Sequence, residues 1–362
     1  MIPETTIRVT SNESCAAAGP QALGATAASG IAELPLPQSR QRRPHGGAAP
    51  LGCLDFSLSI NPLGPPDSLI AAIVPELVTG YPEPGSWTLQ RLIATHHCVA
   101  PESVLVTNGA CEGIELIMAT RPPGRVIVLA PAFTEYEDAA RAWGHEVVTI
   151  AARENRGFHW DFERFDAGQD DLVILGNPAN PTGVISELPN LEATLLVDES
   201  FMDFVDAPVT AIGRPKTLVV RSFTKTYACP GLRLGYVIGD VAMFRVRQPA
   251  WSVGRLAQVA GAAALQDVAY LKFTREFVRQ RRDELVQGLL AIPGVQVVPP
   301  TANFVFFKIP QARAVARRLF ERGIVVRECD RFTGVAPDMY LRVAVRKRSE
   351  NQRLLEALHA AR

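Results

Sequence analysis

The sequence has no excess of charge of either sign, since its 37 lysines and arginines equal its 37 aspartates and glutamates. A chain without net charge has no general attraction for nucleic acids or acidic membranes, although a local basic pocket remains possible. It also lacks any apolar run that approaches the roughly 20 residues of a membrane-spanning helix. We therefore expect a globular protein that binds neither nucleic acid nor membrane, in keeping with its 47% apolar residues.

Cysteine is scarce, with six in 362 residues. The six form no Cys-x-x-Cys pair, and no Cys/His cluster has the spacing of a zinc site. We expect reduced thiols, no metal and a cytoplasmic location. Near the N-terminus the basic residues follow the apolar part instead of preceding it, so we expect no secretory signal.

The length of the chain favours two lobes. Residues 1–44 are rich in Ala, Gly, Ser and Pro, which predicts a flexible N-terminal arm. From about residue 86, short β-branched runs alternate with helical patterns, which indicates a parallel sheet covered on both faces. We predict a segment 45–80 that joins the small domain, a large domain 81–255 and a small α+β domain 256–362.

Polar residues of unusual type directly follow four of the predicted strands. The runs are TNGACEG after Val106, GNPANPTG after Leu175, DES after Val197 and RSFTK after Val220. In open parallel sheets the ligand crevice lies beyond the carboxyl ends of the strands. The sequence therefore predicts one site that combines a glycine turn at a helix start, an asparagine, an acid and a lysine.

This combination suits a phosphorylated, phenolic pyridine aldehyde. The predicted phosphate ligands are the helix start and nearby donors: Ala110, Cys111, Ser222, Thr224 and Arg233. Asp198 can accept a hydrogen bond from a protonated ring nitrogen, Asn180 can donate one to the phenolic oxygen, and Phe133 can stack on the ring. Lys225 can form a Schiff base with the aldehyde. The predicted cofactor is pyridoxal 5′-phosphate, which has all of these groups.

The order of these motifs resembles the fold-type I pyridoxal phosphate enzymes of the class I/II aminotransferase superfamily, over residues 45–346. The motifs are Asn-Gly, Asn-Pro-Thr-Gly, Asp-Glu, Ser-x-x-Lys and Gly-Leu-Arg-x-Gly-Tyr, each after an apolar run. The resemblance implies a mostly parallel seven-stranded sheet in a large α/β/α domain, with a smaller α+β domain. It also implies that Lys225 anchors the cofactor and that Asp198 pairs with the pyridine nitrogen.

The same resemblance implies roles for three further residues. Tyr81, in GYPEPG, matches a tyrosine that reaches the cofactor phosphate of the partner subunit, which implies a homodimer. Arg342, in YLRVAVR, matches the arginine that holds the substrate carboxylate. Phe201, in DESFMDF, stands where many members of the superfamily have a tyrosine, which leaves Asn180 as the main contact of the ring oxygen.

Several stretches are similar to the threonine-phosphate decarboxylases of cobalamin biosynthesis. They are HGGA (45–48), DFSLSINPLGPP (55–66), FTEYEDA, TKTYACPGLRLGY and VVRECDRFTG with YLRVAVR. These enzymes convert O-phospho-L-threonine to (R)-1-aminopropan-2-yl phosphate and carbon dioxide. The similarity implies four residues that bind the phosphorylated amino acid: His45, Asn180, Arg327 and Arg342. Ala48 and Ser59 depart from the usual HGGN and SANINP.

Three alternatives stay open at this point. One is an aminotransferase of the histidinol-phosphate type, because the bond to the α-carbon that breaks depends on how the substrate is oriented, which the sequence does not fix. Another is a related decarboxylase or lyase that acts on a different amino acid in a specialised pathway. The third is a non-catalytic regulator that binds the cofactor, although residues 1–44 show no helix-turn-helix pattern.

Overall fold

The centre of the protein is a seven-stranded, mostly parallel β-sheet. The computed structural model describes residues 47, 49–74, 80–160, 162 and 166–361. The strands lie in the order β2-β8-β7-β6-β5-β3-β4, and β8 alone runs antiparallel to its neighbours. Their bounds are β2 Val104–Thr107, β3 Arg125–Ala130, β4 Glu146–Ala151, β5 Leu172–Gly176, β6 Thr194–Asp198, β7 Thr217–Ser222 and β8 Gly235–Ile238. The predicted seven-stranded sheet is confirmed.

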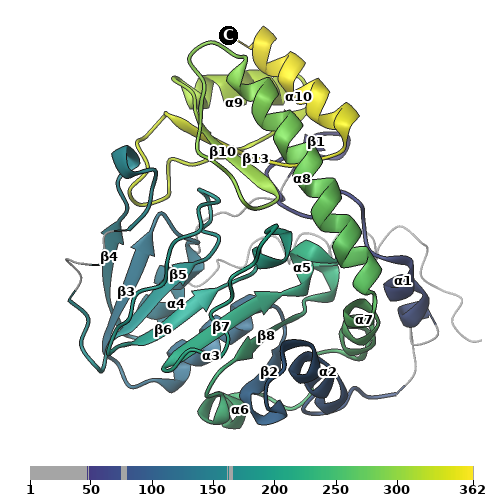
Figure 1. The fold of residues 1–362 in the computed structure, drawn as a ribbon, viewed down its shortest axis with the longest axis vertical. Coiled ribbons are helices and arrows are strands. Elements are labelled where there is room, and N and C mark those ends of the chain that lie inside the picture. Colours follow the sequence, from purple (N-terminus) through teal and green to yellow (C-terminus); the bar gives the residue numbers. More distant parts are fainter. Residues whose placement is uncertain (1–46, 48, 75–79, 161, 163–165, 362) are drawn as a thin grey trace, which may run out of the picture. The chain divides into compact units, whose positions relative to one another are not determined.

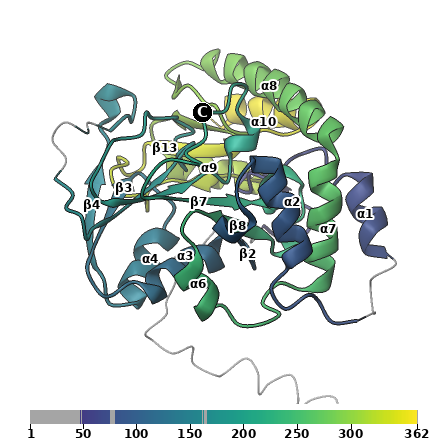
Figure 2. The ribbon, with the colours of Figure 1, turned by 60° about the horizontal axis from the view of Figure 1, so that its bottom comes forward.

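One face of this sheet is covered by helices α3 (Ala110–Thr120), α4 (Glu135–Ala142) and α6 (Ala242–Arg247). Figure 1 shows α3 and α4 behind the strands, and Figure 2 shows α3, α4 and α6 together on one side of the sheet. Every residue of β2, β5 and β8 is buried, so these strands have apolar side chains on both faces. This explains why their sequences lack a period of two.

Near β2 and β8 the other face packs against α1 (Asp67–Ile73), α2 (Trp87–His97) and α7 (Arg255–Gln266). Farther along that face, the core of β3, β5 and β6 is completed by aromatic residues from outside the sheet. They are Phe158, Trp160, Phe306, Phe332 and Tyr340. The sheet is therefore buried on both sides, as the alternation of helices and strands predicted.

The C-terminal part forms a second core around the antiparallel sheet β12-β13-β10-β9. Its strands are β9 Gln296–Val297, β10 Phe304–Lys308, β12 Arg327–Glu328 and β13 Tyr340–Ala344, and its helices are α8 Val268–Leu290, α9 Ala312–Glu321 and α10 Arg348–Ala360. The short strand β1 (Leu54–Asp55) pairs with β11 (Ile324–Val325). The N-terminal segment thus joins this second core, although the exact domain boundaries remain predictions.

Three features of the sequence prediction change, one being that the residue pattern alone did not identify β8 as a strand. The helical pattern after residue 255 is two helices, α7 and α8, because Asp267 caps the start of α8 by accepting a hydrogen bond from the backbone N–H of Tyr270 at 3.0 Å. The sequence analysis also predicted no helix over Arg348–Ala360, where the structure has α10. Within the described part of the chain, no helix combines the length and the apolar character required to cross a lipid bilayer.

Candidate active site

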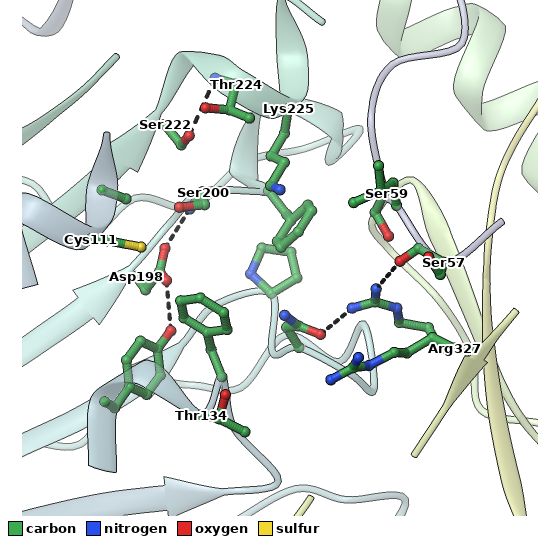
Figure 3. Close-up of a pocket in the computed structure, with 18 of the residues that line it drawn as sticks. Ser57, Ser59, Cys111, Thr134, Asp198, Ser200, Ser222, Thr224, Lys225 and Arg327 are labelled. Carbon is green, nitrogen blue, oxygen red and sulfur yellow. Dashed lines mark hydrogen bonds between the residues drawn. The ribbon is translucent and has the colours of Figure 1, made fainter. Parts of the chain in front are cut away.

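A cavity lies where the carboxyl ends of the parallel strands meet the second core. Its lining joins residues far apart in the sequence: Ser57, Leu58, Ser59, Ala110, Cys111, Phe133, Thr134, Tyr136, Pro178, Asn180, Asp198, Ser200, Phe201, Ser222, Thr224, Lys225, Arg233, Arg327, Phe332 and Arg342. Figure 3 shows Lys225 entering this cavity between a side with Asp198 and Cys111 and a side with Ser59 and Arg327. The structure therefore brings residues that follow four of the predicted strands to one cavity.

Lys225 lies on α5 (Phe223–Thr226), a single helical turn directly after β7. The hydroxyl of Ser222 caps this turn by accepting a hydrogen bond from the backbone N–H of Thr224 at 3.2 Å. Burial, and next the positive charge of Arg342, lower the pKa of the Lys225 amine from 10.5 to about 8. About a tenth of the amine is therefore unprotonated at pH 7, far more than for an ordinary lysine, which favours a nucleophilic role.

Asp198 is the last residue of β6, and both of its carboxylate oxygens accept hydrogen bonds. The hydroxyl of Tyr136 donates to Oδ2 at 2.6 Å, and the backbone N–H of Ser200 donates to Oδ1 at 2.9 Å. Burial first, and then the charge of Asp198, raise the pKa of Tyr136 well above its usual value. Tyr136 therefore stays a neutral donor, which stabilises Asp198 as an anion that faces the cavity.

The first turn of α3, which contains Cys111, lies on the same side of the cavity as Asp198. Gly109 precedes the helix with a positive φ of 79°, and a β-carbon on it would lie 2.7 Å from Nη2 of Arg233. Gly235 lets β8 pass close by, because a β-carbon there would lie 2.6 Å from the backbone nitrogen of Ala110. The free N–H groups of the first turn and the Arg233 guanidinium thus converge on one place, which suits a phosphate.

Two arginines face the cavity from neighbouring strands of the second core. Arg327 on β12 and Arg342 on β13 are directly paired in register. Arg342 donates hydrogen bonds to Oδ1 of Asn180 and, at 2.7 Å, to the carbonyl oxygen of Ser57. Burial lowers the pKa of Arg342 to about 10 and also lowers that of Arg327. Both guanidiniums are therefore poorly solvated cations that an anionic ligand stabilises.

Because Oδ1 of Asn180 accepts from Arg342, the amide nitrogen of Asn180 is the part left to donate to a ligand. The side chain of Phe201 also lines the cavity, and its ring centre lies 5.9 Å from Nζ of Lys225. Phe201 brings no hydroxyl to this place. Asn180 is thus well placed for the ring-oxygen contact that the sequence assigned to it.

Most of the predicted site residues line this one cavity, with two exceptions. His45 lies outside the described residues. Tyr81 does not line the cavity; its side chain is 83% exposed, and its ring lies 5.8 Å from that of Trp251. Its predicted contact with a partner subunit stays a prediction.

The sequence analysis missed several lining residues, of which Tyr136 makes the clearest polar contact. The sequence could have indicated that Tyr136 lies near the cofactor site. It follows Phe133 by three residues, and two residues at that spacing share a face of a helical turn. Ser57 was missed because its contribution to Arg342 is a backbone carbonyl, which no residue pattern reports.

The residues fit pyridoxal phosphate on the evidence of the side chains themselves. A lysine with a lowered pKa, a hydrogen-bonded carboxylate and a glycine-bounded helix start line the same cavity, and they suit the aldehyde, the ring nitrogen and the phosphate of the cofactor. Within the described part of the chain, no group of His, Cys, Asp and Glu side chains is arranged to hold a metal ion.

Comparison with known proteins agrees with this geometry. The family described as aminotransferase class I and II matches residues 54–358. The threonine-phosphate decarboxylase of Salmonella typhimurium is 36% identical over 335 residues, which cover 86% of this chain and 92% of that protein. The histidinol-phosphate aminotransferase of Nitratidesulfovibrio vulgaris strain Hildenborough is 34% identical over 308 residues, covering 78% of this chain and 81% of that protein.

Solved structures give the same two groups. The crystal structure of L-threonine-O-3-phosphate decarboxylase from Porphyromonas gingivalis matches with a TM-score of 0.74 at 27% identity, covering 85% of this chain and 98% of that chain. That of the histidinol-phosphate aminotransferase from Clostridium acetobutylicum matches with a TM-score of 0.77 at 28% identity and the same coverage of both chains. The chain is therefore similar to decarboxylases and aminotransferases alike.

Proposed function

The chain belongs to the class I and II aminotransferase family of pyridoxal-phosphate-dependent enzymes, and on this premise we propose that it decarboxylates O-phospho-L-threonine. The product is (R)-1-aminopropan-2-yl phosphate, a precursor in cobalamin biosynthesis. In this assignment Lys225 and Asp198 are the catalytic residues. Asn180, Arg327 and Arg342 bind the substrate, together with His45.

The charge balance of the cavity is the observation that carries the proposal. Among the described residues, four cationic side chains line it, Lys225, Arg233, Arg327 and Arg342, against the single carboxylate of Asp198. The cofactor phosphate accounts for Arg233, and Asp198 is matched by the protonated ring nitrogen. Arg327 and Arg342 both line the side of the cavity formed by the second core, which supports a substrate with two anionic groups.

O-Phospho-L-threonine has a carboxylate and a phosphate, so it engages both arginines at once. Histidinol phosphate has a phosphate but no carboxylate, so it presents one anionic group fewer to the two arginines. This difference in charge favours the first substrate. The number of histidinol-phosphate aminotransferases among the similar proteins keeps transamination as the second candidate.

The side chains of the cavity have defined tasks in this reaction. Bound pyridoxal phosphate supplies an electron sink for the substrate α-carbon. Arg342, held by Asn180 and Ser57, fixes the direction of the substrate carboxylate. Asp198 keeps the ring nitrogen protonated. Lys225, whose Nζ enters the cavity, can carry a proton to the α-carbon after carbon dioxide leaves.

The test is to supply O-phospho-L-threonine without any keto acid. Release of carbon dioxide together with aminopropanol phosphate supports the proposal. A requirement for 2-oxoglutarate, with glutamate formed, would show that the chain is an aminotransferase instead. A panel of other amino acids scored for carbon dioxide release identifies a decarboxylase with a different substrate.

We also propose a homodimer in which Tyr81 reaches the cofactor phosphate of the partner subunit. The exposed ring of Tyr81 and its contact with the half-exposed Trp251 support an interface there. Mixing inactive Y81A and K225A proteins tests this proposal. Exchange of subunits restores activity if the two residues serve one shared site, whereas inactive mixtures contradict the proposal. A cytoplasmic location stays a prediction.

A further inference from the structure

The helical turn α5, which carries Lys225, cannot hold its own position. It has four residues, and a single turn has little intrinsic stability. The last carbonyl groups of a helix also have no partner inside it. Ser222 caps the start of α5, so its end must be held by another part of the chain.

Asn61 holds that end. Its backbone N–H donates a hydrogen bond to the carbonyl oxygen of Lys225 at 3.0 Å. Its side-chain amide donates to the carbonyl oxygen of Thr226 at 2.8 Å. Asn61 is only 3% exposed, so water does not compete for these bonds. Two consecutive carbonyls, one of them the lysine's own, are therefore satisfied by a residue that precedes them by more than 160 positions.

Asn61 is itself fixed from both directions. On one side Nδ2 lies 2.8 Å from the hydroxyl of Tyr270 and 2.9 Å from that of Thr274, both on α8. On the other side its Oδ1 accepts a hydrogen bond from the backbone N–H of Leu63 at 3.1 Å, which sets the orientation of the amide. Four residues earlier, the carbonyl of Ser57 holds Arg342. The segment 57–61 therefore spans the distance from the substrate arginine to the lysine.

We propose that Asn61 is a positioning residue for Lys225, which fixes α5 so that the amine enters the cavity at a constant distance from the groups around it. The charged and titratable groups that face Lys225 are Arg342, Arg233, Asp198 and Cys111. Asn61 has no charge, so replacing it changes none of them. Any change in the titration of the cofactor bound at Lys225 then reports a displacement of the lysine. This inference does not depend on which substrate the enzyme uses.

The experiment compares N61A with S68A in the holoenzyme. Ser68 is the matched control, because it also joins the N-terminal segment to the start of α8, through a 2.8 Å hydrogen bond to Asp267. For N61A we expect a shifted pH midpoint in the absorbance of the bound cofactor, with no substrate present. We also expect kcat to fall roughly 10- to 100-fold while KM stays within about threefold. S68A, which removes one partly buried hydrogen bond, should lose less thermal stability than N61A and leave the midpoint and kcat unchanged.

If N61A leaves the pH midpoint and kcat unchanged, as S68A should, the proposal is overturned, since Asn61 would then act only on stability. If N61A does not fold, N61S provides the same comparison, because its shorter hydroxyl does not reach the Thr226 carbonyl. A normal midpoint in N61S with wild-type kcat also overturns it. The absorbance titration needs no substrate, so failure of the decarboxylase assignment leaves this test intact.

Discussion

The hydroxyl of Tyr136 donates a hydrogen bond of 2.6 Å to Oδ2 of Asp198, the one carboxylate among the described residues that line the active-site cavity. Tyr136 is 1% exposed, so the bond is shielded from water. The tyrosine thus fixes the acid that we propose pairs with the cofactor ring, and it acts on the chemistry only through Asp198.

Replacement of Tyr136 by phenylalanine removes this donor from a partly buried carboxylate oxygen. We expect Y136F to destabilise the protein by about 1–3 kcal/mol, the cost of an unsatisfied buried partner. We also expect kcat to fall more than the affinity for the substrate, because substrate contacts are untouched. Chemical denaturation and steady-state kinetics measure the two effects, and unchanged kcat would show that the backbone N–H of Ser200 suffices to hold Asp198.

Replacement of Asp198 by asparagine keeps the shape of the side chain but removes its charge. A neutral amide cannot hold the ring nitrogen in its protonated form, so kcat should fall by at least about 100-fold. Cofactor binding should persist, because Lys225 and the phosphate ligands are intact. Absorbance of the bound cofactor serves as the control, and an active D198N enzyme would contradict the role given to the acid.

The pKa of Lys225 makes cofactor uptake by the apo-protein depend on pH. Only the unprotonated amine attacks the aldehyde, so the rate should rise with pH around a midpoint of about 8 instead of 10.5. R342Q removes a positive charge that disfavours the protonated lysine, so the pKa and the midpoint should move upward. Stopped-flow absorbance across the neutral to alkaline range measures both midpoints. A downward movement in R342Q would be inconsistent with the proposed coupling.

A buried ion cluster is linked to the turn that carries Lys225, because the hydroxyl of Thr226 donates a hydrogen bond to Asp203 at 3.1 Å. Arg221 contacts Glu199 at 2.6 Å and Asp203 at 2.9 Å, and the side chains of Arg221 and Glu199 are 8% and 0% exposed. R221M leaves Glu199 buried without its partner, so we expect a loss of about 3–5 kcal/mol in the free energy of unfolding.

The exposed pair of Lys216 and Glu192 offers the comparison for this prediction. K216M should change stability by no more than about 1 kcal/mol, because water screens that pair. Urea denaturation of both variants decides the point. Similar losses in the free energy of unfolding of R221M and K216M would mean that the buried cluster stabilises the protein no more than an exposed ion pair does.

The sequence analysis located the ends of the parallel strands well, because two simple regularities apply to them. Buried parallel strands appear as short apolar runs, and the polar residues after them, such as Asp198 and Lys225, must share one edge of the sheet. The resemblance of the motifs to class I/II aminotransferases is likewise confirmed.

The sequence could not predict the contacts that arise only in three dimensions. Tyr136 lay in a helical pattern, and nothing in that pattern says which acid its hydroxyl meets. Asn61 lies in a segment rich in Gly and Pro with no periodicity, and its partners are backbone carbonyls 160 or more positions away. Strand β8 was missed because four residues with a glycine at the start give too weak a pattern.

The most direct test of the account is to locate the covalent link to the cofactor. The purified protein is saturated with pyridoxal phosphate, reduced with borohydride, digested and analysed by mass spectrometry. We predict that the peptide containing Lys225 carries the reduced cofactor and that K225A protein stays unlabelled and colourless. Label on a different lysine, or a wild-type protein that remains colourless with excess cofactor, would contradict the central claim.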